Sequence, residues 1–225
     1  MIIVLGVQHS HGHGLQRVGG SPFAAVLTRV QTVGGAGGED DLAPPFPIRR
    51  EGAALLAEAG YGPQNPLDVD ILYNTNEGHK KIALAISSMW KHNLGVKAEL
   101  NNMEWKTMVS ALNEGDFGVS RYSWNGDYND ASTFLDIMTS SSSANSGKWF
   151  NKEYDALLAK AHDAKDPAER NRLYQQAEVL IDEEAPIAPV YFYVKSRLLK
   201  PNVKGYPYQN PQDLVYAKDL YLTAQ

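Results

Sequence analysis

Residues 67–100 read LDVDILYNTNEGHKKIALAISSMWKHNLGVKAEL, and this stretch decides the fold class. Residues 67–73 alternate apolar and polar side chains, the pattern of a β-strand. Residues 79–93 carry a wide apolar face at helical spacing, and Leu94-Gly95 ends that helix. Residues 96–100 alternate again as a second strand. A strand, a helix and a strand in so short a stretch predict a βαβ unit with parallel strands, and hence an α/β fold.

The same patterns extend the prediction to the rest of the chain. Further elements are expected as helices at 51–60, 104–113, 152–163 and 167–184 and as strands at 116–124 and 190–194. The helix at 167–184 has Asp166 as its N-cap and Pro167 in its first position. The strand at 190–194 is bounded by Pro186 and Pro189. The tail from Leu198 contains three prolines between short apolar pieces, so we expect it to wrap over a surface.

Residues 1–50 differ in composition from everything that follows. They hold 9 of the 19 glycines but no Lys, Tyr or Trp, whereas all 12 tyrosines and all 4 tryptophans come later. Gly34–Gly38 and Pro44–Pro47 have the composition of a linker, and residues 1–7 lack the basic start of a secretory signal peptide. We expect that residues 1–50 do not form a working domain. They are expected to be either a linker or the translation of a shifted or wrongly started reading frame.

The overall composition excludes several classes of function. The chain of 225 residues has no cysteine, which removes thiol catalysis, cysteine zinc sites and disulfides. A net charge of −5 argues against a nucleic-acid partner. No apolar run is long enough to span a bilayer. The imidazoles of His9, His11 and His13 would form only a weak chelate on a glycine-rich segment, so no native metal and no cofactor are expected.

Catalytic motifs are likewise not found. The sequence has no zinc-protease helix, nucleophile elbow, phosphate-binding loop or dinucleotide fingerprint. The acidic run Asp182-Glu183-Glu184 ends an amphipathic helix, where a solvated face is the simpler interpretation. These observations favour a binding protein over an enzyme.

Residues 121–130, RYSWNGDYND, combine an arginine, a tryptophan, two tyrosines and acidic groups around a glycine where a strand should end. Ligands of α/β proteins commonly bind at such strand ends. An Asp pairs with an amine, an Arg grips a carboxylate, and aromatic rings form apolar walls. Those properties suit a zwitterionic ligand such as a peptide, and the alternative is an aromatic loop that only packs on the fold.

Several segments together resemble the C-terminal part of the periplasmic oligopeptide-binding proteins, the substrate-capture subunits of ABC peptide importers. The segments that carry the resemblance are residues 55–61 (LLAEAGY), 72–75 (LYNT), 79–81 (HKK), 104–107 (EWKT), 124–129 (WNGDYN) and 189–193 (PVYFY). The likeness covers residues 51–225, and residues 123–127 and 185–189 lean towards the murein-tripeptide-binding branch.

The resemblance implies a class II periplasmic-binding-protein fold. Residues 51–188 would form the C-terminal ligand-binding lobe, and residues 189–225 would return to the N-terminal lobe. It also implies a periplasmic location, short peptides and the permease subunits of an importer as partners, and a monomer when complete. The resemblance further implies that the secretion signal and nearly all of the N-terminal lobe are missing, so residues 51–225 alone are expected to bind peptide weakly or not at all.

The resemblance also implies roles for individual residues. Asp127 would hold the peptide α-ammonium in a buried ion pair, with capping of the turn after Gly126 as the alternative. Arg121 and His79 would meet the ligand carboxylate, with a structural ion pair and a plain surface position as alternatives. Trp105, Trp124 and Tyr193 would form walls of side-chain pockets, with core packing as the alternative. Tyr122, Ser123 and Asn125 would offer backbone groups to the peptide main chain. The alternative from a different class of function is an unrelated hydrolase domain, in which Asp127 and His79 would form an acid/base pair.

Overall fold

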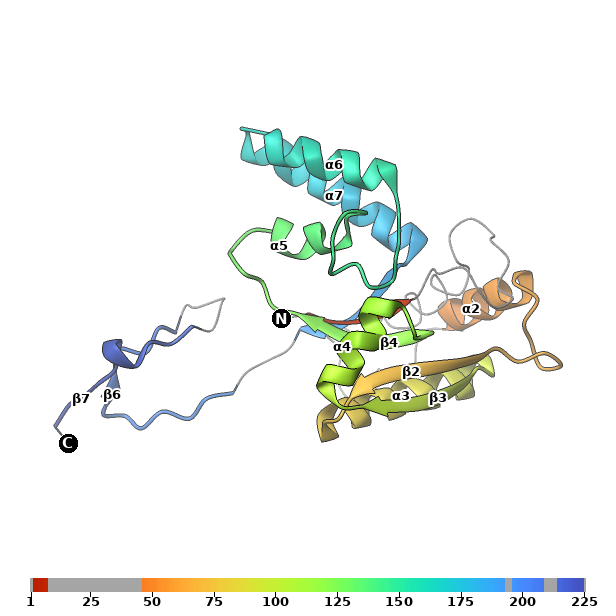
Figure 1. The fold of residues 1–225 in the computed structure, drawn as a ribbon, viewed down its shortest axis with the longest axis horizontal. Helices are drawn as coiled ribbons and strands as arrows, with labels where there is room; N and C mark the ends of the chain where they lie inside the picture. The colour runs from red at the N-terminus through yellow and green to blue at the C-terminus, as the bar shows by residue number, and fades with distance from the viewer. Residues whose placement is uncertain (1, 8–45, 193–195, 209–213, 225) are drawn as a thin grey trace.

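The computed structural model describes residues 2–7, 46–192, 196–208 and 214–224, which form a mixed α/β structure (Figure 1). The strands are β1 Ile2–Val7, β2 Asp68–Asn74, β3 Lys97–Met103, β4 Val119–Trp124, β5 Ile187–Phe192, β6 Val203–Lys204 and β7 Tyr221–Leu222. The helices are α2 Phe46–Glu58, α3 Glu77–Leu94, α4 Trp105–Glu114, α5 Ser132–Leu135, α6 Lys152–Asp163 and α7 Pro167–Glu184, with short 3-10 helices η2 Asp136–Met138 and η3 Ala217–Asp219.

The predicted βαβ unit forms the centre of the structure. β2 pairs in parallel with β3 along its whole length and with β4 at Ile71–Val119 and Leu72–Ser120. Helix α3 connects β2 to β3, capped by the Asn76 side chain at its start and ended by Gly95 at φ 70°. A left-handed C-cap of this kind favours glycine. The predicted strand–helix–strand order and the parallel pairing are therefore confirmed.

Both faces of β2 are covered, as parallel strands require. Ile71 packs with Trp90 of α3 in one buried cluster, and Leu72 packs with Met108 of α4 in another. Neighbouring residues of β2 therefore serve two cores on opposite faces of the sheet. Because a slip of one residue would exchange these two faces, the burial fixes the register of β2.

Helices α6 and α7 lie side by side and form a third apolar cluster with α5 and η2 (Figure 1). Tyr154 is fully buried there and donates a hydrogen bond to the carbonyl of Leu135 at 2.7 Å. The predicted N-cap of α7 is confirmed, since the Asp166 side chain accepts from the backbone N–H of Ala168.

Strand β1 lies inside the five-stranded sheet, whose order is β3-β2-β4-β1-β5. It pairs antiparallel with β4 on one side and with β5 on the other. Part of the compositionally distinct leader therefore contributes backbone to the sheet. The division of the chain at residue 50 stays a prediction, and His9, His11 and His13 lie outside the described residues.

Two element boundaries differ from the sequence prediction for reasons connected with proline. Helix α2 begins at Phe46, inside the stretch assigned to a linker, because proline is tolerated in the first turn of a helix. Strand β5 begins at Ile187 and contains Pro189, which was expected to bound it. β5 is an edge strand with a register shift where it pairs with β1, and edges and bulges accept proline.

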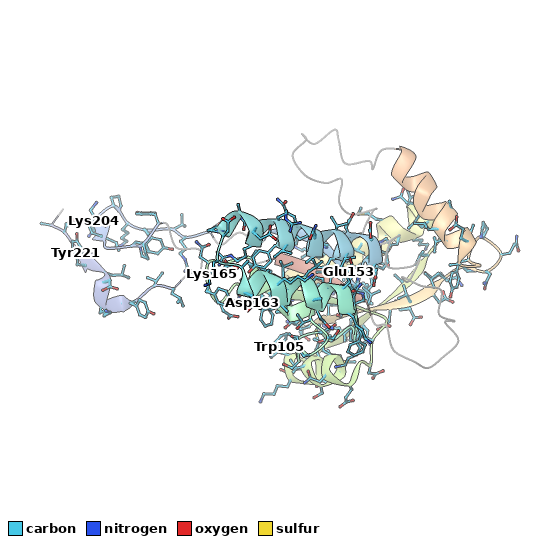
Figure 2. The ribbon with its side chains drawn as sticks, turned by 90° about the horizontal axis from the view of Figure 1, so that it is seen from above. Trp105, Glu153, Asp163, Lys165, Lys204 and Tyr221 are labelled. Carbon is cyan, nitrogen blue, oxygen red and sulfur yellow. The ribbon has the colours of Figure 1, made fainter. Side chains whose placement is uncertain are left out.

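The described part of the tail stands apart from the sheet. Residues 196–208 and 214–224 include no buried residue, and Leu198, Tyr208 and Leu222 are among the exposed apolar side chains. Lys204 and Tyr221 face each other in the β6–β7 pair, which lies well away from the five-stranded sheet in both views (Figures 1 and 2). The expectation that the tail wraps over a surface is wrong for these residues, because they find no apolar partner surface in the described chain. None of the helices in the described part of the chain combines the length and the apolar composition that a membrane span needs.

Asn145 holds the irregular segment between η2 and α6. Its buried side chain donates from Nδ2 to the carbonyl of Trp149 at 2.6 Å, with the carbonyls of Thr139 and Met138 at 3.3 and 3.4 Å. Its Oδ1 accepts from the Trp149 N–H at 3.2 Å. One amide group thus satisfies several backbone groups that have no strand or helix partner.

We predict that Asn145→Ala lowers the free energy of unfolding by about 2–4 kcal/mol, because it leaves buried carbonyls unpaired. Urea unfolding followed by tryptophan fluorescence measures this, with Ser143→Ala, at an exposed position of the same segment, as the control. If Asn145→Ala lowers the free energy of unfolding no more than Ser143→Ala does, the stabilising role of the Asn145 side chain is contradicted.

Candidate functional site

The candidate site lies at the carboxyl ends of β2 and β4. His79 sits in the first turn of α3, directly after β2, and Arg121 sits within β4. Because β2 and β4 are paired in parallel, their carboxyl ends meet at one edge of the sheet. The fold therefore brings together two basic residues that are 42 positions apart in the sequence.

Electrostatic coupling supports the proximity of His79 and Arg121. Burial is the main cause that lowers the pKa of His79, and the positive charge of Arg121 lowers this pKa further. The helix N-terminus also disfavours the imidazolium form. The Nδ1 atom of His79 lies 2.8 Å from Oδ1 of Asn74, so this ring nitrogen donates to the amide oxygen. Arg121, which is only 4% exposed, keeps its charge because a guanidinium does not deprotonate in proteins.

Side chains along β4 alternate between two faces of the sheet. Ser120, Tyr122 and Trp124 line a cavity on one face, and Arg121 is not among the residues of that cavity. The rings of Tyr122 and Trp124 lie with their centroids 6.5 Å apart, and burial raises the pKa of Tyr122. The residues predicted to form one site are therefore divided between a cationic face and an aromatic face.

The loop after β4 is anchored to α5 by close packing at Gly126. A Cβ atom added there would lie 3.1 Å from Cζ of Phe134 and 3.2 Å from Cγ2 of Thr133, closer than ordinary contacts. The backbone N–H of Asp127 donates to Oγ1 of Thr133 at 2.8 Å. Composition did not single out Thr133 or Phe134, because a short four-residue helix leaves little periodicity to detect.

Asp130 anchors the other end of this loop to α7. Its Oδ1 accepts from the Ser132 N–H at 3.0 Å and from the Tyr174 hydroxyl at 3.1 Å, and its Oδ2 lies 3.4 Å from Nη2 of Arg170. The backbone hydrogen bond from Ser132 is the main cause that lowers the pKa of Asp130. Both ends of the loop 125–130 are thus tied to helices.

The remaining predicted residues take different positions. Asp127 is exposed, so the described residues of this chain do not supply the burial that the resemblance implies for it. Asn125 is exposed as well, and Ser123 is half-buried. Trp105 begins α4 and is 51% exposed, outside the cavity beside β4 (Figure 2). Tyr193 lies outside the described residues.

Acidic residues at the end of α7 are more engaged than the sequence suggested. Glu184 accepts hydrogen bonds from the Trp149 indole at 2.6 Å and from Asn151 at 2.8 Å, so it ties α7 to the start of α6. Asp182 lines the cavity beside β4. The interpretation of Glu184 as part of a solvated face is therefore wrong, because the two helices pack at this point. The described residues contain no group of acidic or histidine side chains able to hold a metal ion.

The α/β fold and the polar groups at its strand ends are typical of a ligand-binding domain. Residues 32–146 match the family "Bacterial extracellular solute-binding proteins, family 5 Middle", and the chain belongs to this family. The match begins within the compositionally distinct leader.

Individual relatives agree with this assignment. The chain is 49% identical over 175 residues to the periplasmic murein peptide-binding protein MppA of Escherichia coli, covering 78% of this chain and 33% of MppA. It is 48% identical over 186 residues to YgiS of Escherichia coli, described as a probable deoxycholate-binding periplasmic protein, covering 82% of this chain and 35% of YgiS. The solved structure of Haemophilus influenzae OppA in complex with RPPGFSPFR matches with a TM-score of 0.83 at 32% identity, covering 98% of this chain and 48% of that one.

These comparisons confirm the resemblance and the fold class that the sequence indicated. The chain spans about a third of the length of the curated relatives and about half of the solved structure. The residue roles carried over from the resemblance stay predictions.

We predict that the pKa of His79 in the folded chain lies below its ordinary value of 6.5. Because this pKa is lowered, the unfolded state binds the proton more readily, and the contribution of His79 to stability is lost as pH falls below 6.5. Nuclear magnetic resonance titration of the imidazole measures the pKa directly.

Arg121→Gln and Arg121→Lys form the matched pair for this titration. Arg121→Gln should raise the pKa of His79 part of the way back, since burial still acts, whereas Arg121→Lys should leave most of the shift because it keeps the charge. Equal values in both variants would exclude an effect of the Arg121 charge.

Proposed function

We propose that the chain is the C-terminal ligand-binding part of a periplasmic solute-binding protein that captures short peptides for an ABC importer, without catalysis. The observation that carries the proposal is the pair of basic side chains, His79 and Arg121, at the same sheet edge as a rigidly held loop with the exposed carboxylate of Asp127. A peptide carries one positive and one negative terminus, so a site with both charges suits its two ends.

In this proposal the peptide lies along the end of β4. Asp127 binds the α-ammonium and Arg121 attracts the terminal carboxylate. His79 contributes only when its Nε2 is protonated, a form that the nearby carboxylate of the ligand favours. Ser123, Asn125 and Tyr122 supply those main-chain groups that the pairing of β4 with β1 leaves unengaged, and every peptide satisfies such groups regardless of its sequence. Trp105, Trp124 and Tyr193 form side-chain pockets. The relatives are longer than this chain. In this proposal the additional length forms a second lobe, which covers the ligand and excludes water.

A specific observation supports murein tripeptide as the second candidate ligand. The chain is 49% identical over 175 residues to the murein peptide-binding protein of Escherichia coli. The permease subunits of an importer are the proposed partners, and the complete protein is proposed to be a periplasmic monomer. If the domain were instead a hydrolase with Asp127 and His79 as acid and base, Asp127→Ala and His79→Ala would each abolish turnover.

The first test supplies a second lobe by placing residues 51–225 into Haemophilus influenzae OppA in place of the matching segment. This chain is 45% identical to that OppA over 181 residues, which makes a folded chimera a fair starting point. We predict that the chimera binds RPPGFSPFR or the murein tripeptide in calorimetry, whereas the isolated residues 51–225 bind weakly or not at all. A folded chimera that binds neither peptide contradicts the proposal.

Within the chimera, Asp127→Asn should weaken peptide binding by about 30-fold or more, because it removes one partner of a desolvated ion pair. The control is Asp116→Asn, an exposed aspartate in the turn before β4, at the opposite end of the strand. N-terminal acetylation of the peptide should reproduce the loss. An unchanged affinity in Asp127→Asn removes this residue from the site while leaving the family assignment intact.

C-terminal amidation of RPPGFSPFR tests the cationic face. We predict that the amide binds the chimera about tenfold more weakly than the free acid, because one charge-assisted contact is lost. Arg121→Gln should bring the affinities of acid and amide together. If the difference persists in Arg121→Gln, the carboxylate is bound elsewhere.

A further inference from the structure

A cavity of about 350 Å³ opens between the aromatic face of β4 and the helices α5 and α7. Its walls are mainly aromatic and aliphatic and include Tyr122, Trp124, Phe134, Met138, Ile181 and Ile187. A space of this size and composition is typical of sites for small ligands with an apolar body. It lies on the face of β4 opposite to Arg121 and His79, so it is separate from the proposed grip on the peptide carboxylate.

The charges of the cavity all have one sign among the residues that the structure describes. Glu178 and Asp182 are its only charged lining residues, and no Lys, Arg or His lines it. The two carboxylates are four residues apart, which places them on the same face of α7. Both residues are exposed, so they mark the mouth of the cavity and not its base. Such a mouth attracts a cation and repels an anion.

One residue of the cavity lining, Trp124, carries a buried hydrogen-bond donor. The Nε1 atom of Trp124 is buried and has no hydrogen-bond acceptor among the described residues. Trp149, which packs in the cluster of α6 and α7, differs in this respect, because its indole N–H donates a hydrogen bond to Glu184. A buried donor of this kind favours a ligand that brings an acceptor, because leaving the donor unsatisfied costs free energy.

We propose that this cavity is a second binding site, which takes a small aromatic amine that carries a hydrogen-bond acceptor. It shares Tyr122 and Trp124 with the proposed peptide site but none of the charged residues of that site. The ring fills the apolar walls, the acceptor meets the Trp124 indole, and the ammonium group lies at the mouth beside Glu178 and Asp182. The site excludes carboxylic acids with a similar apolar body, because the mouth is acidic. Binding there does not require Asp127, Arg121 or His79.

The test titrates the ¹⁵N-labelled 225-residue chain at low salt with L-phenylalaninamide, followed by nuclear magnetic resonance. L-Phenylalaninamide has the ring, the ammonium group and a carbonyl acceptor. We expect the Trp124 indole N–H signal to shift in a saturable way while the Trp149 indole signal stays in place. Phenethylamine, which lacks the carbonyl, should bind more weakly, and the anionic N-acetyl-L-phenylalanine should bind at least tenfold more weakly. No saturable shift at 10 mM L-phenylalaninamide overturns the proposal.

Variants separate this site from the proposed peptide site. Glu178→Gln with Asp182→Asn should weaken L-phenylalaninamide binding about fivefold, whereas Glu183→Gln, an exposed neighbour outside the cavity lining, should not change it. Trp124→Phe, followed through backbone amide signals of α7, should weaken L-phenylalaninamide but not phenethylamine. Asp127→Asn should leave both unchanged. If Asp127→Asn weakens binding and the double variant does not, the ligand occupies the peptide site and the cavity is not a second site.

Discussion

The parallel pairing of β4 with β2 is the constraint on which the site depends. It brings the end of β4 beside Asn74 and the first turn of α3, and so it places Arg121 next to His79. The pairing is held by burial on both faces of β2, where Ile71 and Leu72 contribute to different apolar clusters. A shift of register would lose both clusters and move Arg121 to the apolar face, so the cationic site and the hydrophobic core are stabilised by the same contacts.

The loop after β4 depends on a second set of contacts, which are polar and local. Gly126 allows the backbone to approach Phe134 closely, and Asp130 joins α5 to α7 through Ser132 and Tyr174. A loop fixed at both ends loses little further conformational freedom when a ligand binds. Asp127 therefore stands on a preorganised support although its own side chain is exposed.

The sequence predicts the elements of this structure better than their arrangement around the site. Long periodic segments such as 152–163 and 167–184 were predicted at the bounds where α6 and α7 are observed, because their caps and apolar faces are local properties. Pro189 misled the prediction of β5, since the position of a strand at a sheet edge is a tertiary property. The division of Arg121 and Trp124 between two faces follows from simple alternation, yet the resemblance had assigned both to one cleft.

The exposure of Asp127 bears on how an ion pair at this position would work. A carboxylate that is already buried has lost its hydration before any ligand arrives, whereas an exposed one keeps its hydration until a ligand and a covering surface exclude water. The cost of desolvation then falls within the binding step, and only a ligand that supplies a well-placed cation and further hydrogen bonds offsets it. Apolar molecules without an amine, or amines that leave the main-chain groups of β4 unpaired, would be rejected at this step. An exposed carboxylate on a rigid loop is thus a basis for selecting ligands with a free amino terminus, provided that a second surface closes over it.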